Sequence, residues 1–323
     1  MKYIEILGTG RAAPKDIVTN DEISNHIDTS NEWILSRTGI EERRICGEEN
    51  SLDLAVTACN HALQNSNINP KDIDAIIVAT ITGDMITPSM ACMVQKEIGA
   101  INATAFDING ACTGFIFGLS IGESLITSGK AGKVLVLGIE MLSKVIDWKD
   151  RSTCVLFGDG AGCAILGQGT KGIKAIYTKS YGDLGHNIQI GGLAAKKVFA
   201  HKPFKENNHN IYMNGREVFK FATFVIIDAV EKVLKESDLT IEKIDLIIPH
   251  QANKRIIEFA SKKMGVDLEK FYINLDKYGN TSSASIPMAL DEAIERKIIK
   301  EGQRVILVGF GGGLTAGAVL VEF

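Results

Sequence analysis

Apolar and polar residues alternate along this chain in two patterns that predict different elements. Short apolar runs predict buried strands, for example at 75–78, 134–137, 244–249 and 305–308. Longer stretches carry apolar residues at helical spacing, which predicts helices over 51–66, 89–99, 113–129, 214–236, 253–264 and 284–298. Strands that alternate with helices in this way indicate an α/β protein.

The stretch 113–129 differs from the other predicted helices because it is apolar on nearly every side. Its apolar residues include Phe115, Ile116, Leu119, Leu125 and Ile126. A helix with this composition is typically buried on all sides. We therefore expect it to lie at the centre of the fold.

Two parts of the chain read alike. Ile73 and Ile244 each begin an Ile-Asp dipeptide within an apolar run, and they are 171 positions apart. Val134 and Val305 hold equivalent places in a second pair of runs, with the same separation of 171 positions. A constant separation indicates an internal repeat. The chain is therefore predicted to contain two duplicated α/β halves stacked around central helices.

We place the two halves at residues 1–170 and 171–323. Each ends on a Gly-rich stretch followed by an apolar strand, at 158–162 and 311–313, and both stretches are expected to be hairpin turns. Gly8 begins a formal dinucleotide-binding fingerprint, but Pro14 opposes the helix that must follow, so an ordinary turn is expected. The segment 167–215, rich in Gly, Asn and Lys, is expected to be mostly loop.

The overall composition indicates a folded protein with no general affinity for polyanions. The chain has 323 residues, of which 45% are hydrophobic and 23% charged, and its net charge is −4. Binding to nucleic acid or to an anionic membrane is therefore not expected. No apolar run is long enough for a membrane span, and the N-terminus lacks the apolar block of a signal peptide. We expect a cytoplasmic location.

The cysteines do not form a recognisable framework. The sequence has six of them and no Cys-x-x-Cys pair. Reduced thiols are expected, and neither disulfides nor a zinc site is predicted.

Three polar residues are set at strand ends or their connections, each just before a helical pattern: Cys112, His250 and Asn280. Ligands of open α/β sheets gather outside the carboxyl ends of the strands. We therefore expect these three side chains to meet in one crevice. A thiol at the start of a helix is stabilised as a thiolate by unpaired N–H groups and the helix dipole. This predicts a lowered thiol pKa and a nucleophile that attacks thioesters.

Each of these residues, taken singly, has an ordinary structural explanation. Free cysteines are among the most buried residues, so Cys112 fits a core position. His250 fits a hydrogen-bonded core histidine, and Asn280 fits a helix cap. Their joint occurrence in a duplicated α/β chain favours a catalytic site.

Seven short motifs are distributed along the chain: Asn31–Ile34, Arg37–Ile40, Ala111–Phe115, Phe157–Gly162, His250–Asn253, Gly279–Ser282 and Phe310–Gly313. Through these motifs the chain resembles, over nearly its whole length, the β-ketoacyl-acyl-carrier-protein synthase III group of the thiolase-like condensing enzymes. The resemblance implies a thiolase-like fold of two halves stacked as an α-β-α-β-α sandwich. Related thiolases use a second cysteine and elongating synthases use two histidines. Here no cysteine follows Cys163 and His250 is the last histidine, as in the priming type.

The resemblance implies a reaction in two stages that uses no metal and no cofactor. CoA enters as part of the acyl-CoA substrate and is therefore not counted as a cofactor. Cys112 takes the acyl group from an acyl-CoA primer, and the N–H groups of Cys112 and Gly312 bind the oxyanion. Malonyl-acyl-carrier protein then loses carbon dioxide, and donors on His250 and Asn280 stabilise the enolate that attacks the acyl group. Phe310 is expected to wall the pocket, and the alternative is a plain core phenylalanine.

The resemblance also implies a site for CoA. Trp33 and Arg151 are expected to sandwich the adenine, with Arg37 near the phosphates. Thr29 and Asn253 are expected to assist. The alternative for Trp33 is a half-exposed anchor of its helix.

A carrier-protein site is expected on an outward helix face. Apolar residues recur every fourth position in 253–264, which leaves Arg255 and Lys262 facing outward. With Lys220 they are predicted to form a basic spot for the acidic carrier protein, and a plain solvated face is the alternative.

One departure from the family concerns the primer. Many members have phenylalanine before the proline at the floor of the acyl pocket, contributed across a homodimer, whereas this chain has Thr87 before Pro88. The smaller side chain predicts primers longer or more branched than acetyl.

Three other functions compete with this interpretation. His250 and Asn280 follow Cys112 by 138 and 168 residues, close to the spacing of papain-type hydrolases. The duplication and the absence of the papain sequence context oppose that reading. An acyltransferase or condensing enzyme of a specialised polyketide or quinolone pathway stays open, as does a non-catalytic partner subunit.

Overall fold

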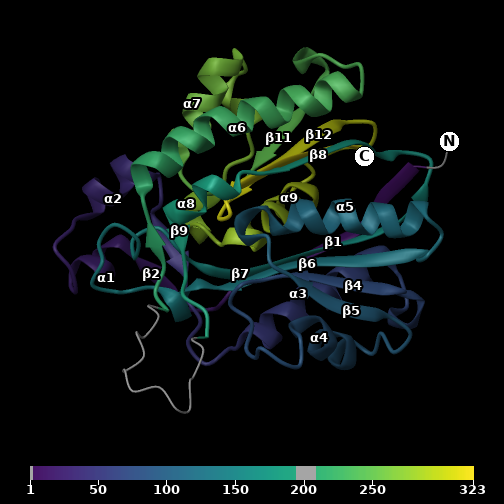
Figure 1. The fold of residues 1–323 in the computed structure, drawn as a ribbon, viewed down its shortest axis with the longest axis horizontal. Helices are drawn as coiled ribbons and strands as arrows, with labels where there is room; N and C mark the ends of the chain where they lie inside the picture. The colour runs from purple at the N-terminus through teal and green to yellow at the C-terminus, as the bar shows by residue number, and fades with distance from the viewer. Residues whose placement is uncertain (1–2, 194–208) are drawn as a thin grey trace.

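The structure is a computed structural model that describes residues 3–193 and 209–323. Two mixed sheets are stacked within these ranges (Figure 1), in the orders β1-β7-β6-β4-β5 and β11-β12-β13-β8. Their strands are β1 (Tyr3–Ala12), β4 (Ala75–Ala79), β5 (Thr104–Ile108), β6 (Lys133–Met141), β7 (Asp159–Gly169), β8 (Gly172–Ser180), β11 (Leu246–Pro249), β12 (Arg304–Gly311) and β13 (Thr315–Glu322).

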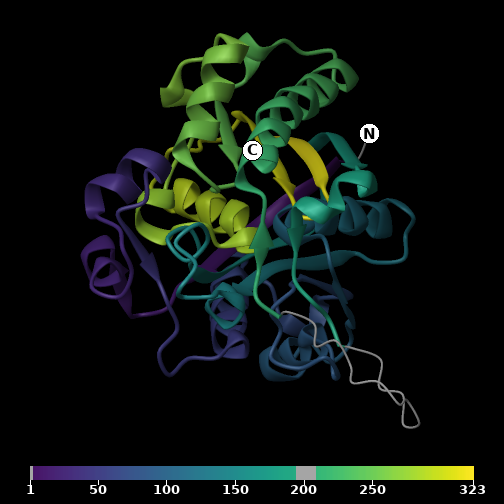
Figure 2. The same ribbon diagram turned by 60° about the vertical axis from the view of Figure 1, so that its left-hand side comes forward.

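Helices cover both sheets and fill the space between them. One pair lies between the sheets, a second covers the outer face of the first sheet, and a third covers the second sheet (Figures 1 and 2). These pairs are α5 (Gly114–Thr127) with α9 (Ser285–Glu295), α3 (Ser51–Ser66) with α4 (Met90–Ile98), and α6 (Gly215–Glu236) with α7 (Lys254–Met264). The expected α-β-α-β-α sandwich is confirmed.

All the helices predicted from apolar periodicity are present, with ends within about three residues of the expected ones. Helix α3 begins where Asn50 and Asp53 form a reciprocal capping box. Helix α5 is buried between the sheets, as its composition predicts, because Phe115, Ile116 and Leu119 are all fully enclosed.

The repeat found in the sequence is visible in the strand pairing. β4 and β6 pair in parallel, as do β11 and β12, which lie 171 positions later. β7 is antiparallel to β6 and β1, and β13 is antiparallel to β12 and β8. The two sheets therefore share one topology. The boundary expected at residues 170 and 171 falls between β7 and β8, and the division into two domains stays a prediction.

Two glycine-rich stretches expected to be turns lie inside strands instead. Gly8 and Gly10 are within β1, and the stretch 158–162 runs into β7. A Cβ at Gly10 would lie 2.2 Å from the carbonyl oxygen of Ala58 in α3, and one at Gly162 would lie 2.6 Å from the backbone nitrogen of Met288 in α9. These glycines admit a helix backbone against the sheet. The turn expected at 311–313 is confirmed, because it joins β12 to β13.

The expectation of loops over 167–215 is wrong for its first part, which forms β8 along the edge of the second sheet. Backbone pairing with β13 overrides the weak local signal there. Residues 194–208 lie outside the described ranges. The remaining elements are β2 (Ile17–Thr19), β3 (Glu42–Arg44), β9 (Ile188–Gln189), β10 (Tyr212–Met213), α1 (Asn20–Ser24), α2 (Asn31–Thr38) and α8 (Leu275–Tyr278), besides short 3-10 turns η1 to η7.

In the described part of the chain, every helix is too short or too polar to cross a membrane. The six cysteines are free thiols.

Candidate active site

Cys112, His250 and Asn280 line one cavity of about 270 Å³. Cys112 lies in the 3-10 turn η2 (Ala111–Thr113), between β5 and the buried helix α5. His250 directly follows β11, and Asn280 lies between α8 and the turn η7 (Ser282–Ala284). The structure therefore brings the three expected side chains together, from segments far apart in the sequence. Their individual roles stay predictions.

The thiol of Cys112 is less acidic than the sequence suggests. Burial raises the pKa of Cys112 to about 11, although the Ser282 hydroxyl and the N–H groups of Cys112 and Gly312 lower it. The expected fall of the pKa toward neutrality is wrong for the resting protein, because desolvation of the thiolate outweighs the donors around it. The same N–H groups are the ones expected to bind the oxyanion.

His250 is buried, with 1% of its surface exposed, and its ring orientation is fixed by Ser285. The distance from Nδ1 to the Ser285 hydroxyl oxygen is 2.6 Å, and that oxygen also accepts from the N–H of Gln251. The hydroxyl hydrogen is available to Nδ1, and on this ground we assign the ring hydrogen to Nε2. Burial lowers the pKa of His250 to about 3, so the imidazole is neutral. A neutral imidazole with its hydrogen on Nε2 is a hydrogen-bond donor for the cavity.

Asn280 is fixed by both its backbone and its side chain. Its N–H donates to the carbonyl of Leu156, and its carbonyl accepts from the N–H of Gly158. The side-chain oxygen accepts from the N–H of Ser282 at 2.8 Å. Because the side-chain oxygen already accepts this hydrogen bond, the NH₂ group of Asn280 is the part of the amide available to donate to a ligand in the cavity.

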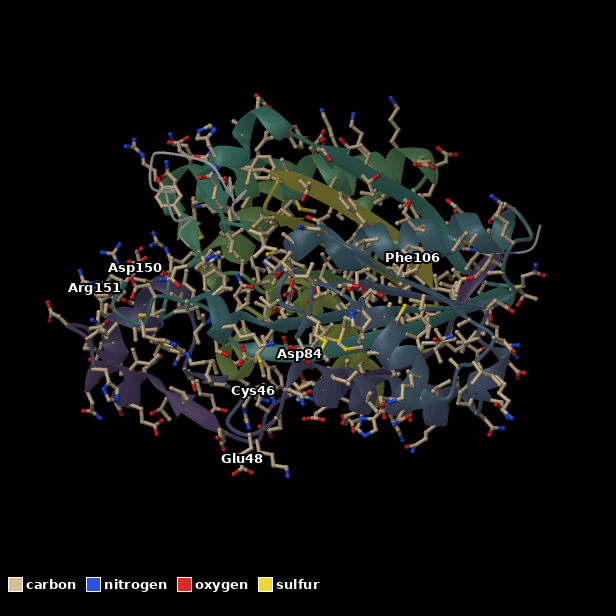
Figure 3. The ribbon with its side chains drawn as sticks, turned by 60° about the horizontal axis from the view of Figure 1, so that its bottom comes forward. Cys46, Glu48, Asp84, Phe106, Asp150 and Arg151 are labelled. Carbon is tan, nitrogen blue, oxygen red and sulfur yellow. The ribbon has the colours of Figure 1, made fainter. Side chains whose placement is uncertain are left out.

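Trp33 and Arg151 lie against each other beside this cavity. Trp33 lines the cavity, and the guanidinium carbon of Arg151 is 4.9 Å from the centroid of its ring. Arg151 also donates to the carbonyl of Asp28, and Figure 3 shows it next to Asp150 at the edge of the molecule. The two residues are neighbours, as expected, but a planar base fits between them only if Arg151 swings away.

Known proteins are similar to the chain along its whole length. The family model for 3-oxoacyl-[acyl-carrier-protein (ACP)] synthase III matches residues 106–183, and the model for its C-terminal part matches 234–323. A β-ketoacyl-[acyl-carrier-protein] synthase III from Clostridium acetobutylicum is 50% identical, and the alignment covers 100% of this chain and 99% of that protein. The chain belongs to the β-ketoacyl-acyl-carrier-protein synthase III family.

Solved structures of the synthase III family have the same fold. The 3-oxoacyl-[acyl-carrier-protein] synthase III of Aquifex aeolicus is 43% identical with a TM-score of 0.93, covering 99% of this chain and 100% of that one. A priming β-ketosynthase from the R1128 polyketide biosynthetic pathway is 33% identical with a TM-score of 0.92, covering 99% and 96%. The thiolase-like fold expected from the sequence is confirmed.

The other residues expected at the CoA site of this synthase III chain differ in their surroundings. Arg37 is exposed at the cavity lining. The amide of Asn253 also lines the cavity, but it donates to the carbonyl of Arg37 and accepts from the N–H of Arg255, so the protein uses both of its ends. The hydroxyl of Thr29 is buried and finds no hydrogen-bond partner among the described residues. Phe310 lines the cavity and packs its edge against His250, with ring centroids 5.2 Å apart.

The residues expected to bind the carrier protein lie outside the cavity. Arg255 and Lys262 are exposed on α7, and Lys220 is exposed on α6. Lys220 forms an ion pair with Glu217, which reduces the net positive charge there.

Thr87 is exposed and is not part of the cavity of its own chain. A contribution to the acyl pocket of a partner subunit stays a prediction.

Sequence reasoning assigned no role to several residues at the site, Ser285 and Glu140 among them. Ser285 orients His250, and the available signal was that four of the five residues after Asn280 are serine or threonine. Glu140 is a buried carboxyl beside Ser282, and its signal was a lone acid within the apolar strand β6.

Proposed function

We propose that this chain acts as a β-ketoacyl-acyl-carrier-protein synthase III. It joins an acyl-CoA primer to malonyl-acyl-carrier protein by decarboxylative Claisen condensation and so starts fatty acid synthesis. The strongest support is the single cavity lined by Cys112, His250 and Asn280 in a chain 50% identical to a protein of that name.

In the first stage the Cys112 sulfur attacks the thioester carbon of acyl-CoA. The oxyanion that forms needs donors, and the N–H groups of Cys112 and Gly312, which lower the pKa of the Cys112 thiol, are the donors we assign to it. Loss of one such donor typically raises a barrier by about 3 kcal/mol. CoA leaves as a thiolate, and the acyl group stays on Cys112 as a thioester.

In the second stage malonyl-acyl-carrier protein loses carbon dioxide and becomes an enolate. His250 supplies Nε2–H and Asn280 supplies its NH₂ group, and both donors are uncharged and held in place by other residues. Preorganised donors in a dry site stabilise the developing negative charge. The apolar ring of Phe310 beside His250 disfavours the malonyl carboxylate and thereby promotes its loss. The enolate carbon then attacks the acyl thioester and releases Cys112.

These steps require acyl-CoA and malonyl-acyl-carrier protein as partners but no metal or cofactor. Dialysis against a chelator is therefore expected to leave the activity unchanged. A cytoplasmic location is also part of the proposal, and the six free thiols support a reducing compartment.

A homodimer belongs to the proposal as well. Met85 and Ile86 beside Thr87 are 57% and 78% exposed, which is unusual for large apolar side chains and supports a contact with a second subunit. Light scattering of the purified protein tests this. If Thr87 enters the partner's acyl pocket, branched and longer acyl-CoA primers are expected to react, and strict use of acetyl-CoA would refute that part.

Intact mass spectrometry tests the two stages separately. A panel of acyl-CoA primers is expected to add one acyl group to the wild-type protein and none to Cys112→Ala. Malonyl-acyl-carrier protein added afterwards is expected to remove the acyl group and yield the ketoacyl product. Absence of acylation by every primer tested would overturn the proposed function.

Acylation without condensation would favour an acyltransferase of a specialised pathway. The 33% identity to a polyketide priming synthase keeps that alternative open, while the 50% identity to a protein named β-ketoacyl-[acyl-carrier-protein] synthase III favours an acceptor on acyl-carrier protein. The papain-type alternative is wrong, because the chain has the fold of synthase III.

A further inference from the structure

When Cys112 attacks the acyl-CoA thioester, the proton of its thiol must pass to an acceptor. His250 is a poor acceptor, because burial lowers its pKa to about 3 and Ser285 already occupies its Nδ1. A different group with proton affinity in the neutral range lies behind the nucleophile.

That group is Glu140 in β6, a carboxyl with 0% of its surface exposed. It accepts from the Thr82 hydroxyl at 2.5 Å and from the N–H of Ile81 at 3.2 Å. The hydroxyls of Ser282 and Ser283 each lie 3.3 Å from its Oε1. Burial raises the pKa of Glu140 to about 7, although these uncharged donors lower it. The carboxyl is therefore able to change protonation state near neutral pH.

Ser282 connects this carboxyl to the nucleophile. The turn η7 that holds Ser282 packs against the turn η2 that holds Cys112. The Ser282 hydroxyl lowers the pKa of Cys112, and the same hydroxyl donates to Glu140 over 3.3 Å. The N–H of Ser282 donates to Asn280, which holds the serine in place. The negative charge of Glu140 also raises the pKa of Cys112. The thiol and the carboxyl therefore compete for one proton across a single hydroxyl group.

The surroundings of Glu140 supply few other charges. Thr82 faces it from the loop after β4, Ser282 and Ser283 face it from η7, and Cys112 faces it from η2. Lys144 lies beyond Thr82, donating to its carbonyl and to the carboxylate of Asp84, which Figure 3 labels. The charges of Lys144 and Asp84 offset each other, so this ion pair adds little net charge near Glu140.

We propose that Glu140, acting through the Ser282 hydroxyl, takes up the thiol proton of Cys112 during acylation and returns it after condensation. Glu140 does not touch the substrate and acts on the nucleophile only through Ser282, so we call it a positioning residue. The proposal rests on the acyl-transfer function proposed above.

The proton balance of the cycle is closed. As Cys112 forms its bond to the acyl carbon, its proton passes to Ser282 while the Ser282 hydroxyl proton passes to Glu140. The thioester bond of acyl-CoA breaks, and the departing CoA thiolate takes a proton from solvent. After condensation the bond between Cys112 and the acyl carbon breaks, and the thiolate regains its proton from Glu140 through Ser282. One solvent proton is consumed in each cycle, as decarboxylation of a malonate requires.

Single-turnover acylation measured from pH 5.5 to 9 tests this assignment. General-base assistance typically contributes about 10²- to 10⁴-fold, so Glu140→Gln and Ser282→Ala are each expected to slow acylation at pH 7 by about 100-fold. The wild-type rate is expected to rise with an apparent pKa near 7, and Glu140→Gln is expected to lack that rise. Glu140→Asp is expected to restore part of the rate.

Two comparisons separate the relay from simpler roles of these residues. The double variant Glu140→Gln with Ser282→Ala is expected to be no slower than either single variant, because both break one relay. Ser283→Ala removes a hydroxyl at the same 3.3 Å from Glu140 and is expected to have a smaller effect than Ser282→Ala.

Any of three results in the acylation assays would overturn the relay. One is Glu140→Gln acylating as fast as wild type or faster at pH 7 to 9, as expected if its charge only repels the thiolate. Another is an unchanged pH profile together with a lower melting temperature, and the third is multiplicative losses in the double variant. If Glu140→Gln fails to fold, the acylation rate and pH profile of Ser282→Ala are used instead, and a wild-type rate with a wild-type profile would overturn the relay.

Alkylation of Cys112 by iodoacetamide keeps the relay distinguishable from the proposed function, because it needs no acyl-CoA. If the Cys112 thiol and the Glu140 carboxyl share a proton, the alkylation rate plotted against pH is expected to show an inflection near pH 7 in wild type. Glu140→Gln is expected to lack this inflection. Identical profiles overturn the relay. If wild type shows the inflection but no acyl-CoA reacts, the acyl-transfer function fails while the coupling stands.

Discussion

Substitution of Ser285 tests whether the orientation of His250 matters for condensation. Ser285 and His250 are both buried, and the 2.6 Å contact between them is the one that places the ring hydrogen on Nε2. Ser285→Ala leaves Nδ1 without this partner and allows the other tautomer, which offers no donor to the enolate. A buried polar group without its partner costs about 1–3 kcal/mol. If that cost falls on the transition state, condensation slows by about 5- to 150-fold.

The assay starts from isolated acyl-enzyme, so that the two stages are measured apart. Malonyl-acyl-carrier protein is added, and release of carbon dioxide and of the ketoacyl product is followed in single turnover. Acylation by acyl-CoA is expected to stay within about 2-fold of wild type, because Cys112 and its N–H donors do not contact Ser285.

Ser261→Ala is the matched control. Its hydroxyl is also buried and also makes a 2.6 Å hydrogen bond, to the carbonyl of Val266, but it lies in α7 away from the cavity lining. Both variants are expected to lose about 1 kcal/mol of stability, and only Ser285→Ala is expected to lose condensation. Equal condensation rates in the two variants, or an equal loss of acylation and condensation in Ser285→Ala, would refute the reasoning.

Further predictions concern stability and CoA binding. Burial lowers the pKa of His250 from 6.5 to about 3, so below pH 6.5 the unfolded chain binds a proton that the folded chain does not. This removes about 2 kcal/mol of stability between pH 6.5 and 5, and urea denaturation of His250→Asn is expected to show a correspondingly shallower decline. Gly162→Ala places a methyl group 2.6 Å from the backbone of Met288 and is expected to cost about 1–3 kcal/mol, seen as a lower melting temperature, whereas Gly182→Ala enters open space and changes little. Trp33→Ala is expected to raise the KM for acyl-CoA by about 5- to 30-fold, from the loss of about 1–2 kcal/mol of ring contact, without slowing condensation of isolated acyl-enzyme.

Local patterns were sufficient for most of the fold. The apolar periodicity located each of the predicted helices, because a helix that packs on a sheet must keep an apolar face whatever its neighbours are. The offset of 171 positions located the equivalent strands, because both halves bury the same runs.

Local patterns assigned several glycines to turns that are in fact inside strands. Gly10 and Gly162 read as turns, since glycine most often serves turns. Both lie in strands where a helix backbone approaches from a distant part of the sequence. Such an approach has no signature within the strand itself. The edge strand β8 was missed for a similar reason, because its pairing partner β13 is about 140 residues away.

The sequence by itself determined which chemical groups this protein brings to its site: a thiol, an imidazole and a carboxamide, each at the end of a strand or beside a helix start. Only the tertiary structure decided their state. Enclosure makes the thiol of Cys112 less acidic and the ring of His250 neutral, and it brings the pKa of Glu140 to about 7. The physical reason is that the cost of burying a charge depends on every surrounding atom, and those atoms come from strands and turns that no local stretch of sequence specifies together.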